Sequence, residues 1–265
     1  MSGAPRVPLA ELAAYLDGYL RVREWPDEAN ALNGLQVENG GSVGRLVGAV
    51  DASLATIEGL AEARGVAAPA LLLVHHGLFW DGNVPATGRR YQRLRALFAQ
   101  DAALYSAHIP LDAHADVGNN AVLARDLHLT DVQPFGEYRG RLIGVAGTLP
   151  AELQPRDALL RRLATLLDLP APPRCIPGGP DVVRRLAIVT GGASGKIREA
   201  REAGCEAFLT GEGPHHTYFD AMEWGVSVIY AGHYKTETVG VRALGVHLAE
   251  RFGLPFAFHD HPTGL

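Results

Sequence analysis

The chain has 265 residues, of which 47% are hydrophobic and 20% charged, and its formal net charge is −5 at pH 7. This composition is typical of a folded globular protein, and the sequence has no apolar stretch long enough to form a membrane-spanning helix, which excludes a transmembrane helix. The acidic balance, with Lys196 and Lys235 as the only lysines, argues against nucleic acid as a partner.

The first half of the chain predicts helices that alternate with short apolar strands. Pro8 opens the first expected helix, which has Leu9, Leu12 and Leu16 on one face. The continuous apolar run over residues 71–74 is typical of a strand that is buried on both faces. The other expected elements of this half are strands at 46–50 and 104–107 and helices at 54–60, 91–98 and 119–127. This alternation predicts an α/β fold with much parallel strand pairing.

Residues 128–184 differ from the rest of the chain because they are rich in proline. We expect one strand at 142–149 and one helix at 159–167 in this connecting region, after which the strand–helix alternation resumes. The chain therefore divides into two α/β lobes, with terminal elements free to cross between them. The predicted lobes are residues 1–127 and residues 128–265.

The two lobes repeat each other weakly, which indicates a duplicated α/β unit. Each lobe contains a tyrosine at the end of an expected strand, a histidine three residues later and an acidic residue four positions beyond the histidine. These residues are Tyr105, His108 and Asp112 in one lobe and Tyr230, His233 and Glu237 in the other. A duplication of this kind places equivalent strand ends opposite each other, and it predicts a metal site in the cleft between the two similar lobes.

Metal-ligating side chains occur where four of the expected strands end. His75 and His76 directly follow the buried run at 71–74. Two other strand ends carry His108 with Asp112 and His233 with Glu237, and a fourth carries Glu212 with His215 and His216. In open α/β sheets the ligand crevice lies beyond the carboxyl ends of the strands. We therefore expect these groups to lie close together in the folded chain.

The types of residue in these clusters predict a metal. Imidazole and carboxylate suit Zn, Fe(II), Mn or Co, and the lack of thiolate ligands argues against a structural zinc site. Carboxylates such as Asp112 and Glu237 can bridge two cations that lie about 3.5–4 Å apart. The ligand supply is therefore sufficient for two divalent metal ions per chain. Any one of these histidines alone is more often a surface or core residue, so the prediction depends on the joint pattern.

Five stretches of the sequence also follow the order and the residues of a known family. They are NGLQVE (Asn33 to Glu38), VHHGLFWDG (Val74 to Gly82), HIPLDAHADVGNNA (His108 to Ala121), TGE (Thr210 to Glu212) and AGHYKTET (Ala231 to Thr238). In these motifs the chain resembles the Nif-three-like dinuclear metal-centre hexameric proteins, whose members are often labelled GTP cyclohydrolase 1 type 2. The resemblance spans essentially the whole chain and is weakest over residues 128–184.

The resemblance implies a ligand set and an assembly. The positions that match the family's metal ligands are His75, His76, Asp112, His233 and Glu237. His108 would line the site, and the chains would form a ring-shaped homohexamer whose metal sites face an inner cavity. The residues that depart from close relatives, or vary in the family, are Tyr234, Lys235, His215 and His216. Their roles stay open at this point.

We expect a metal-dependent hydrolase that acts on a small-molecule substrate such as a nucleotide. In the cyclohydrolase reaction, metal-activated water attacks a C–N bond of the purine ring, with His108 or Glu212 as the catalytic proton shuttle. Phosphoester or amide hydrolysis fits the same residues. The alternative is a hexameric metal-binding scaffold, or a protein that binds a partner or nucleic acid, without catalysis. Two cysteines and the lack of a signal-peptide pattern predict a cytoplasmic location.

Overall fold

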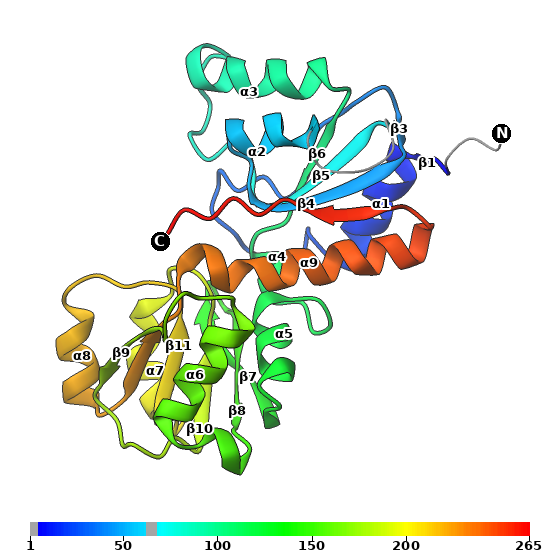
Figure 1. Ribbon diagram of the computed structural model, residues 1–265. Coiled ribbons are helices and arrows are strands. Elements are labelled where there is room, and N and C mark those ends of the chain that lie inside the picture. The colour runs from blue at the N-terminus through cyan, green and yellow to red at the C-terminus, as the bar shows by residue number, and fades with distance from the viewer. Residues whose placement is uncertain (1–4, 62–67) are drawn as a thin grey trace. The chain divides into compact units, whose positions relative to one another are not determined.

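The computed structural model describes residues 5–61 and 68–265, and the chain divides into two compact units (Figure 1). Unit 1 consists of Met1–Leu111 and Val241–His261, and unit 2 consists of Asp112–Gly240 and Pro262–Leu265. This division differs from the predicted boundary between residues 127 and 128, because the helix that precedes this boundary packs through Leu123 and Leu127 into the core of unit 2. Residues 241–261 belong to unit 1.

Unit 1 is built around a five-stranded sheet of order β13-β4-β5-β6-β2. These strands are β2 (Gly34–Val37), β4 (Arg45–Asp51), β5 (Ala70–His76), β6 (Ala103–Ser106) and β13 (Phe256–Phe258). The first four strands of this order are parallel, and β2 pairs antiparallel with β6. The predicted parallel pairing of β4, β5 and β6 is therefore confirmed. Two further short strands, β1 (Val7–Pro8) and β3 (Ser42–Val43), pair antiparallel with each other.

Helices cover the sheet of unit 1. They are α1 (Leu9–Tyr19), α2 (Leu54–Glu58), the 3-10 helix η1 (Gly59–Ala61) and α3 (Gly88–Ala99). The hydroxyl of Ser53 caps α2 by accepting a hydrogen bond from the backbone N–H of Thr56 at 3.0 Å. Helices α2 and α3 lie together on one side of the sheet, where Ile57, Leu60 and Leu97 are fully buried (Figure 1). Two helices, α4 (Ile109–Asp112) and α9 (His233–Phe252), cross the division between the units.

Unit 2 contains a six-stranded sheet of order β7-β8-β10-β11-β12-β9. Its strands are β7 (Thr130–Tyr138), β8 (Arg141–Thr148), β9 (Arg174–Pro177), β10 (Arg185–Ile188), β11 (Ala207–Thr210) and β12 (Ser227–Tyr230). The three strands β10, β11 and β12 are parallel, and antiparallel strands flank them on both sides. Each unit thus contains three neighbouring parallel strands, β4-β5-β6 in unit 1 and β10-β11-β12 in unit 2. This recurrence confirms two similar α/β lobes.

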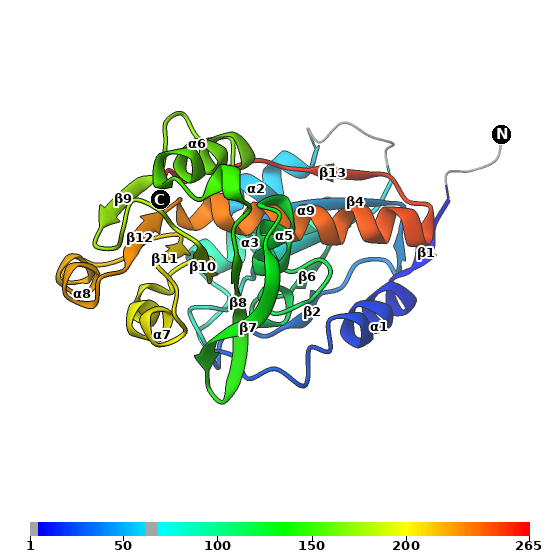
Figure 2. The same ribbon diagram turned by 90° about the horizontal axis from the view of Figure 1, so that it is seen from below.

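The helices of unit 2 pack on both faces of its sheet. They are α5 (Asn119–Asp126), η2 (Ala151–Leu153), α6 (Arg156–Leu166), η3 (Ser194–Lys196), α7 (Ile197–Glu202) and α8 (Thr217–Trp224). Figure 2 shows α6 on one side of strands β10 to β12 and α7 and α8 on the other. Helix α8 ends at Gly225, whose φ of 67° lies in the left-handed region that favours glycine. None of the helices within residues 5–61 and 68–265 combines the length and apolar character needed to cross a bilayer.

The proline-rich region holds more strands than the single one predicted at 142–149. Strand β7 forms a hairpin with β8, and β9 pairs antiparallel with β12. Both extra strands lie at the edges of the sheet. Residues 130–134 of β7 are exposed, so this part of the strand lacks the apolar alternation of a buried strand. Pro134 is tolerated in β7 because an edge strand has one side without a hydrogen-bonded neighbour.

Candidate metal centre

Three histidines of unit 1 lie together where two neighbouring parallel strands end. His75 and His76 are the last residues of β5, and His108 follows β6. One ring nitrogen of each histidine lies within 4.8 Å of those of the other two. His75 is fully buried, whereas the side chains of His76 and His108 are 20% and 18% exposed. The structure therefore brings these three predicted residues together, and the geometry makes His108, predicted as a proton shuttle, a third possible ligand in this unit.

Each of these three imidazoles is oriented through its Nδ1 atom. The partners are the Ala107 carbonyl for His75 at 2.9 Å, Asp51 for His76 at 2.9 Å and Asp27 for His108 at 2.7 Å. A carbonyl or an ionised carboxylate only accepts hydrogen bonds, so Nδ1 carries the proton and the lone pair of the neutral ring is on Nε2. Histidines that bind metals are commonly oriented in this way by oxygen acceptors.

Asp27, in the loop before β2, is hydrogen-bonded to His108. Besides the ring of His108, it accepts hydrogen bonds from the Asn33 side chain at 2.7 Å and from the Ile109 backbone at 3.1 Å. The Asn33 side chain in turn accepts from the backbone N–H of His108 at 2.7 Å. Burial raises the pKa of Asp27, but the hydrogen bonds from His108 and Asn33 outweigh it and lower this pKa overall. Asp27 is therefore an ionised acceptor that fixes the position of His108.

The indole of Trp80 borders the same histidine cluster. Its ring lies edge-on to the rings of His76 and His108, with centroid distances of 5.9 and 5.0 Å. Within the described part of the chain, the buried Nε1–H of Trp80 has no hydrogen-bond partner. A buried donor without an acceptor costs free energy. This N–H is therefore a candidate contact for an oxygen atom of a bound molecule.

A second cluster in unit 2 lies in the first turn of α9. His233 begins the helix and Glu237 follows four residues later, so both side chains are on the same helix face. Nε2 of His233 lies 3.1 Å from Oε1 of Glu237, and its Nδ1 lies 2.8 Å from Oε1 of Glu212, which follows β11. The side chain of Glu237 is 3% exposed and that of Glu212 is 51% exposed. Three predicted residues thus meet in this unit.

Asp112 also belongs to unit 2, and two neutral donors hold its carboxylate. Asn119 donates to its Oδ1 at 2.8 Å, and the hydroxyl of Thr190 donates at 3.1 Å. The next residue, Gly191, has φ 68°, and a Cβ there would overlap Oε1 of Glu237. A glycine at this position keeps the space next to Glu237 open. In the part of the chain that the structure describes, Asp112 does not join a group of three ligand atoms within 4.8 Å.

The hydrogen bond that His233 donates to Glu237 raises the pKa of His233 to about 9, although burial acts in the opposite direction. Hydrogen bonding to Glu212 contributes to the increase. In the metal-free chain, His233 is therefore protonated at neutral pH. A metal ion that binds to Nε2 has to displace this proton, so metal uptake at this residue releases a proton.

This pKa predicts how the stability of the metal-free chain depends on pH. Because the pKa is higher in the folded chain than the ordinary value of 6.5, the stabilisation is complete below about pH 6.5 and is lost as the pH rises through about 9. Denaturant titrations of chelator-treated protein should show this decrease. The His233→Gln variant should lack it, and an equal decrease in both proteins would contradict the assignment to His233.

The donor set fits borderline divalent cations. It consists of imidazole nitrogens and carboxylate oxygens, without thiolates, and this set is suited to Zn, Fe, Mn or Co. In both units the histidines are oriented at Nδ1 by oxygen atoms, which directs Nε2 to a cation. His215 and His216 do not join either cluster among the described residues. These two histidines follow Glu212 closely in the sequence, but they are not part of this donor set.

The sequence interpretation did not identify the oxygen acceptors of unit 1. Asp51 ends β4 and is paired in register with His76, so the strand-end argument applied to the other residues could have found it. Asp27 lies 81 residues before His108 in an irregular loop, and no local pattern indicates it. Asn33 begins the NGLQVE stretch and is assigned no role by the sequence, but its side chain contacts both Asp27 and the backbone of His108.

Known proteins are similar to this chain along its whole length. Residues 8–263 match the family model described as Duf34/NIF3 (NGG1p interacting factor 3). A protein of Deinococcus radiodurans named GTP cyclohydrolase 1 type 2 homolog is 45% identical over 267 residues, which cover 100% of this chain and 97% of that relative. A relative of the same name from Halobacterium salinarum is 42% identical, and the match covers 97% and 99% of the two chains.

Solved structures show the same fold. A crystal structure of a protein from Thermus thermophilus matches with a TM-score of 0.86 and 41% sequence identity. The match covers 98% of this chain and 100% of that protein. The matched span therefore includes both units.

Proposed function

The chain belongs to the Duf34/NIF3 family, and on this basis we propose that it is a metal-dependent hydrolase of the GTP cyclohydrolase 1 type 2 kind. The chain would bind two divalent ions of Zn, Fe, Mn or Co. The proposed ligands are His75, His76, Asp112, His233 and Glu237. The substrate would be a purine nucleotide, and the reaction would hydrolyse a C–N bond in the imidazole ring of its base.

The orientation of the histidines is the observation that supports this proposal most directly. Four histidines from the ends of β5, β6 and β12 each place Nδ1 against an oxygen acceptor. A histidine that is buried for packing alone does not need its Nε2 atom directed to other titratable groups. In unit 1 the Nε2 atoms lie near further imidazoles, and in unit 2 Nε2 of His233 lies beside the carboxylate of Glu237, so both clusters present the nitrogen and oxygen donors that a divalent cation binds.

Bound divalent cations would supply activation of a water molecule and polarisation of the substrate. The residues of the chain would position the substrate and transfer protons. His108 would accept a proton from the attacking water at Nε2 and return it to the leaving nitrogen, and Asp27 would stabilise the imidazolium through Nδ1. Glu212 would orient His233, and its exposed carboxylate is the second candidate for proton transfer. The Trp80 N–H would donate a hydrogen bond to a substrate oxygen.

A screen of the metal-loaded protein tests the reaction. The chain would be purified without chelator, analysed for metal and loaded separately with Zn, Fe(II), Mn and Co. Each form would be incubated with GTP, a phosphodiester and an amide, with His108→Ala as the variant that lacks the proton shuttle. We expect about two ions per chain and ring opening of GTP that is strongly reduced in His108→Ala.

Other results of this screen would count against the proposal. Turnover of the phosphodiester or the amide alone would retain a hydrolase but exclude the cyclohydrolase reaction. Full metal binding without turnover of any compound would favour a metal-binding scaffold. Less than one ion per chain in every preparation would remove the basis for a dinuclear site.

We further propose that six copies assemble into a ring and that the protein acts in the cytoplasm. Both statements are supported by the family resemblance and, for the location, by the sequence composition. Light scattering on the purified protein tests the assembly, and the expected mass is that of six chains. A monomeric or dimeric mass at micromolar concentration would contradict it.

A further inference from the structure

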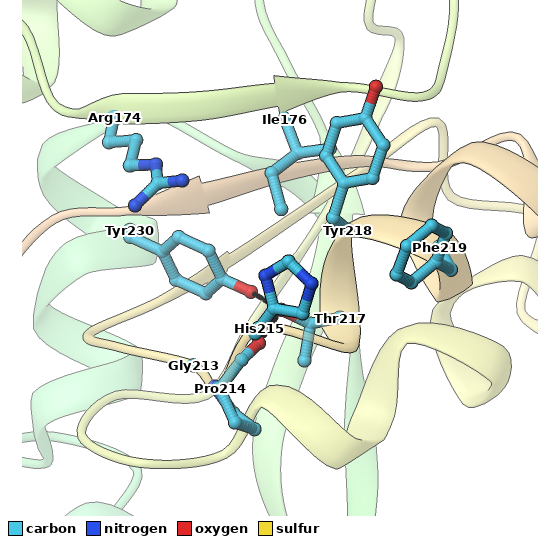
Figure 3. A pocket seen from close by; sticks show the side chains of 9 residues that line it. All are labelled: Arg174, Ile176, Gly213, Pro214, His215, Thr217, Tyr218, Phe219 and Tyr230. Atoms are coloured by element: carbon cyan, nitrogen blue, oxygen red, sulfur yellow. Dashed lines mark hydrogen bonds between the residues drawn. The ribbon is translucent and has the colours of Figure 1, made fainter.

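Unit 2 contains a cavity of about 520 Å³ on the side of the sheet that carries α8 (Figure 3). Arg174 and Ile176 of β9, Tyr218 and Phe219 of α8, and Tyr230 of β12 supply much of its lining. Its volume is within the range of small-molecule sites. None of the residues assigned to the metal centre lines this cavity, so it is a separate feature of unit 2.

The cavity adjoins the His233 cluster along the chain. Gly213, which lines it, directly follows Glu212, the residue that accepts a hydrogen bond from His233. Tyr230, which ends the neighbouring parallel strand β12, precedes His233 by three residues. A Cβ at Gly213 would overlap the phenol of Tyr230, so the loop after β11 lies directly against this ring. A molecule in the cavity would therefore lie next to the loop that positions His233.

The walls of the cavity are rich in aromatic rings. Tyr218 and Phe219 are 47% and 51% exposed, which is unusual for side chains of this size. The ring of His215 contacts that of Phe219 edge-on, with a centroid distance of 5.7 Å. The Tyr230 hydroxyl is hydrogen-bonded to Thr217, and burial raises the pKa of this tyrosine. Exposed aromatic surfaces of this kind favour the stacking of a planar ring.

Arg174 supplies a positive charge at the edge of these aromatic walls. Within the described ranges, its guanidinium forms no hydrogen bond or ion pair, although its charge acts on Tyr230. None of the described lining residues is acidic. Other arginines of unit 2, such as Arg156 and Arg198, are paired with carboxylates. Arg174 is therefore available for an anionic group, to which a guanidinium can donate two parallel hydrogen bonds.

We propose that this cavity binds a planar aromatic ring that carries an anionic group, with the ring against Tyr218 and Tyr230 and the anion on Arg174. In the reaction, the cavity would bind a nucleotide next to the loop that positions His233. This role in the reaction rests on the proposed function, whereas the binding itself does not. A nucleoside monophosphate and an aromatic carboxylate share this chemistry, and the experiment distinguishes them.

Isothermal titration calorimetry of the full-length protein provides the test. The probes are GMP, guanosine, ribose 5-phosphate and 4-hydroxybenzoate. We expect saturable binding of GMP, weaker binding of guanosine and no detectable binding of ribose 5-phosphate. Arg174→Gln should weaken the binding of GMP at least about 10-fold, because a hydrogen bond to a charged group is lost, and should leave guanosine within about 2-fold. Tyr218→Ala should weaken both at least about 5-fold.

Matched variants separate this effect from general changes. Arg184→Gln removes an exposed arginine of the same unit, and Tyr91→Ala removes an exposed tyrosine outside the cavity. Both should leave GMP binding unchanged, and circular dichroism should show that all variants fold.

The outcomes distinguish the binding proposal from the proposed function. Saturable binding of 4-hydroxybenzoate in place of GMP, with the same sensitivity to Arg174→Gln, would support the cavity and identify an aromatic carboxylate as its ligand. GMP binding without any hydrolysis would support the cavity and contradict the reaction. If no ring-containing probe binds, or if binding is insensitive to both Arg174→Gln and Tyr218→Ala, the proposal is wrong.

Discussion

Glu237→Gln is expected to remove at least one metal ion per chain and to lower turnover by more than about 100-fold. Loss of a residue that only supports a metal ligand lowers activity by up to about 100-fold, and loss of a proposed ligand should have a larger effect. Glutamine has nearly the volume of glutamate, so the buried position beside His233 stays filled. Its neutral amide, however, is a poor ligand for a divalent cation, and its NH₂ group can turn toward Nε2 of His233. Metal analysis after gel filtration and a turnover assay measure the two effects.

The matched control is Glu250→Gln, which changes an exposed glutamate on the same helix. It should keep full metal content and full turnover. Circular dichroism of both variants shows whether α9 is retained. If Glu237→Gln binds as much metal as the unaltered chain, Glu237 is not a ligand, and the assignment of the cluster in unit 2 has to be abandoned.

Strands buried on both faces could be predicted from the sequence, whereas edge strands could not. The run at 71–74 is apolar at every position because β5 is covered on both sides, and β4 and β6 are its parallel neighbours. By contrast, β7 is exposed over residues 130–134, so no hydrophobic pattern distinguishes it from a loop. The structure also divides the chain at a different place from the predicted boundary, since α5 packs through Leu123 and Leu127 into the core of unit 2, which is a tertiary effect.

For the site, the sequence predicted the groups that directly follow strands and missed their supporting partners. His75, His76, His108 and His233 were identifiable because parallel strands direct their carboxyl ends to one edge of a sheet. Asp27 could not be identified in this way. Its contact with His108 joins a loop to a strand end 81 residues away, and one aspartate in a loop carries no signal of such a contact.

Asp27→Asn is the second substitution for which we expect a large effect. Asp27 accepts hydrogen bonds from His108, Asn33 and Ile109 at the same time. An asparagine has one oxygen and one NH₂ group in place of two oxygens. Its NH₂ group would therefore face one of these three hydrogen-bond donors and could not accept a hydrogen bond from it. Turnover should fall by about 100-fold or more, since an Asp→Asn change that leaves a catalytic histidine in the wrong tautomer costs about 10⁴-fold in serine proteases.

Because Asp27 is proposed to act through His108, the two substitutions should not add. The double variant Asp27→Asn/His108→Ala should turn over as slowly as His108→Ala alone, and a further loss in the double variant would show that Asp27 has another role. Metal content should stay at the unaltered level in Asp27→Asn, since Asp27 is not a proposed ligand. Asp131→Asn, at an exposed aspartate of β7, is the control and should change neither quantity. Equal turnover in Asp27→Asn and the unaltered chain would exclude His108, held in this tautomer, as the proton shuttle.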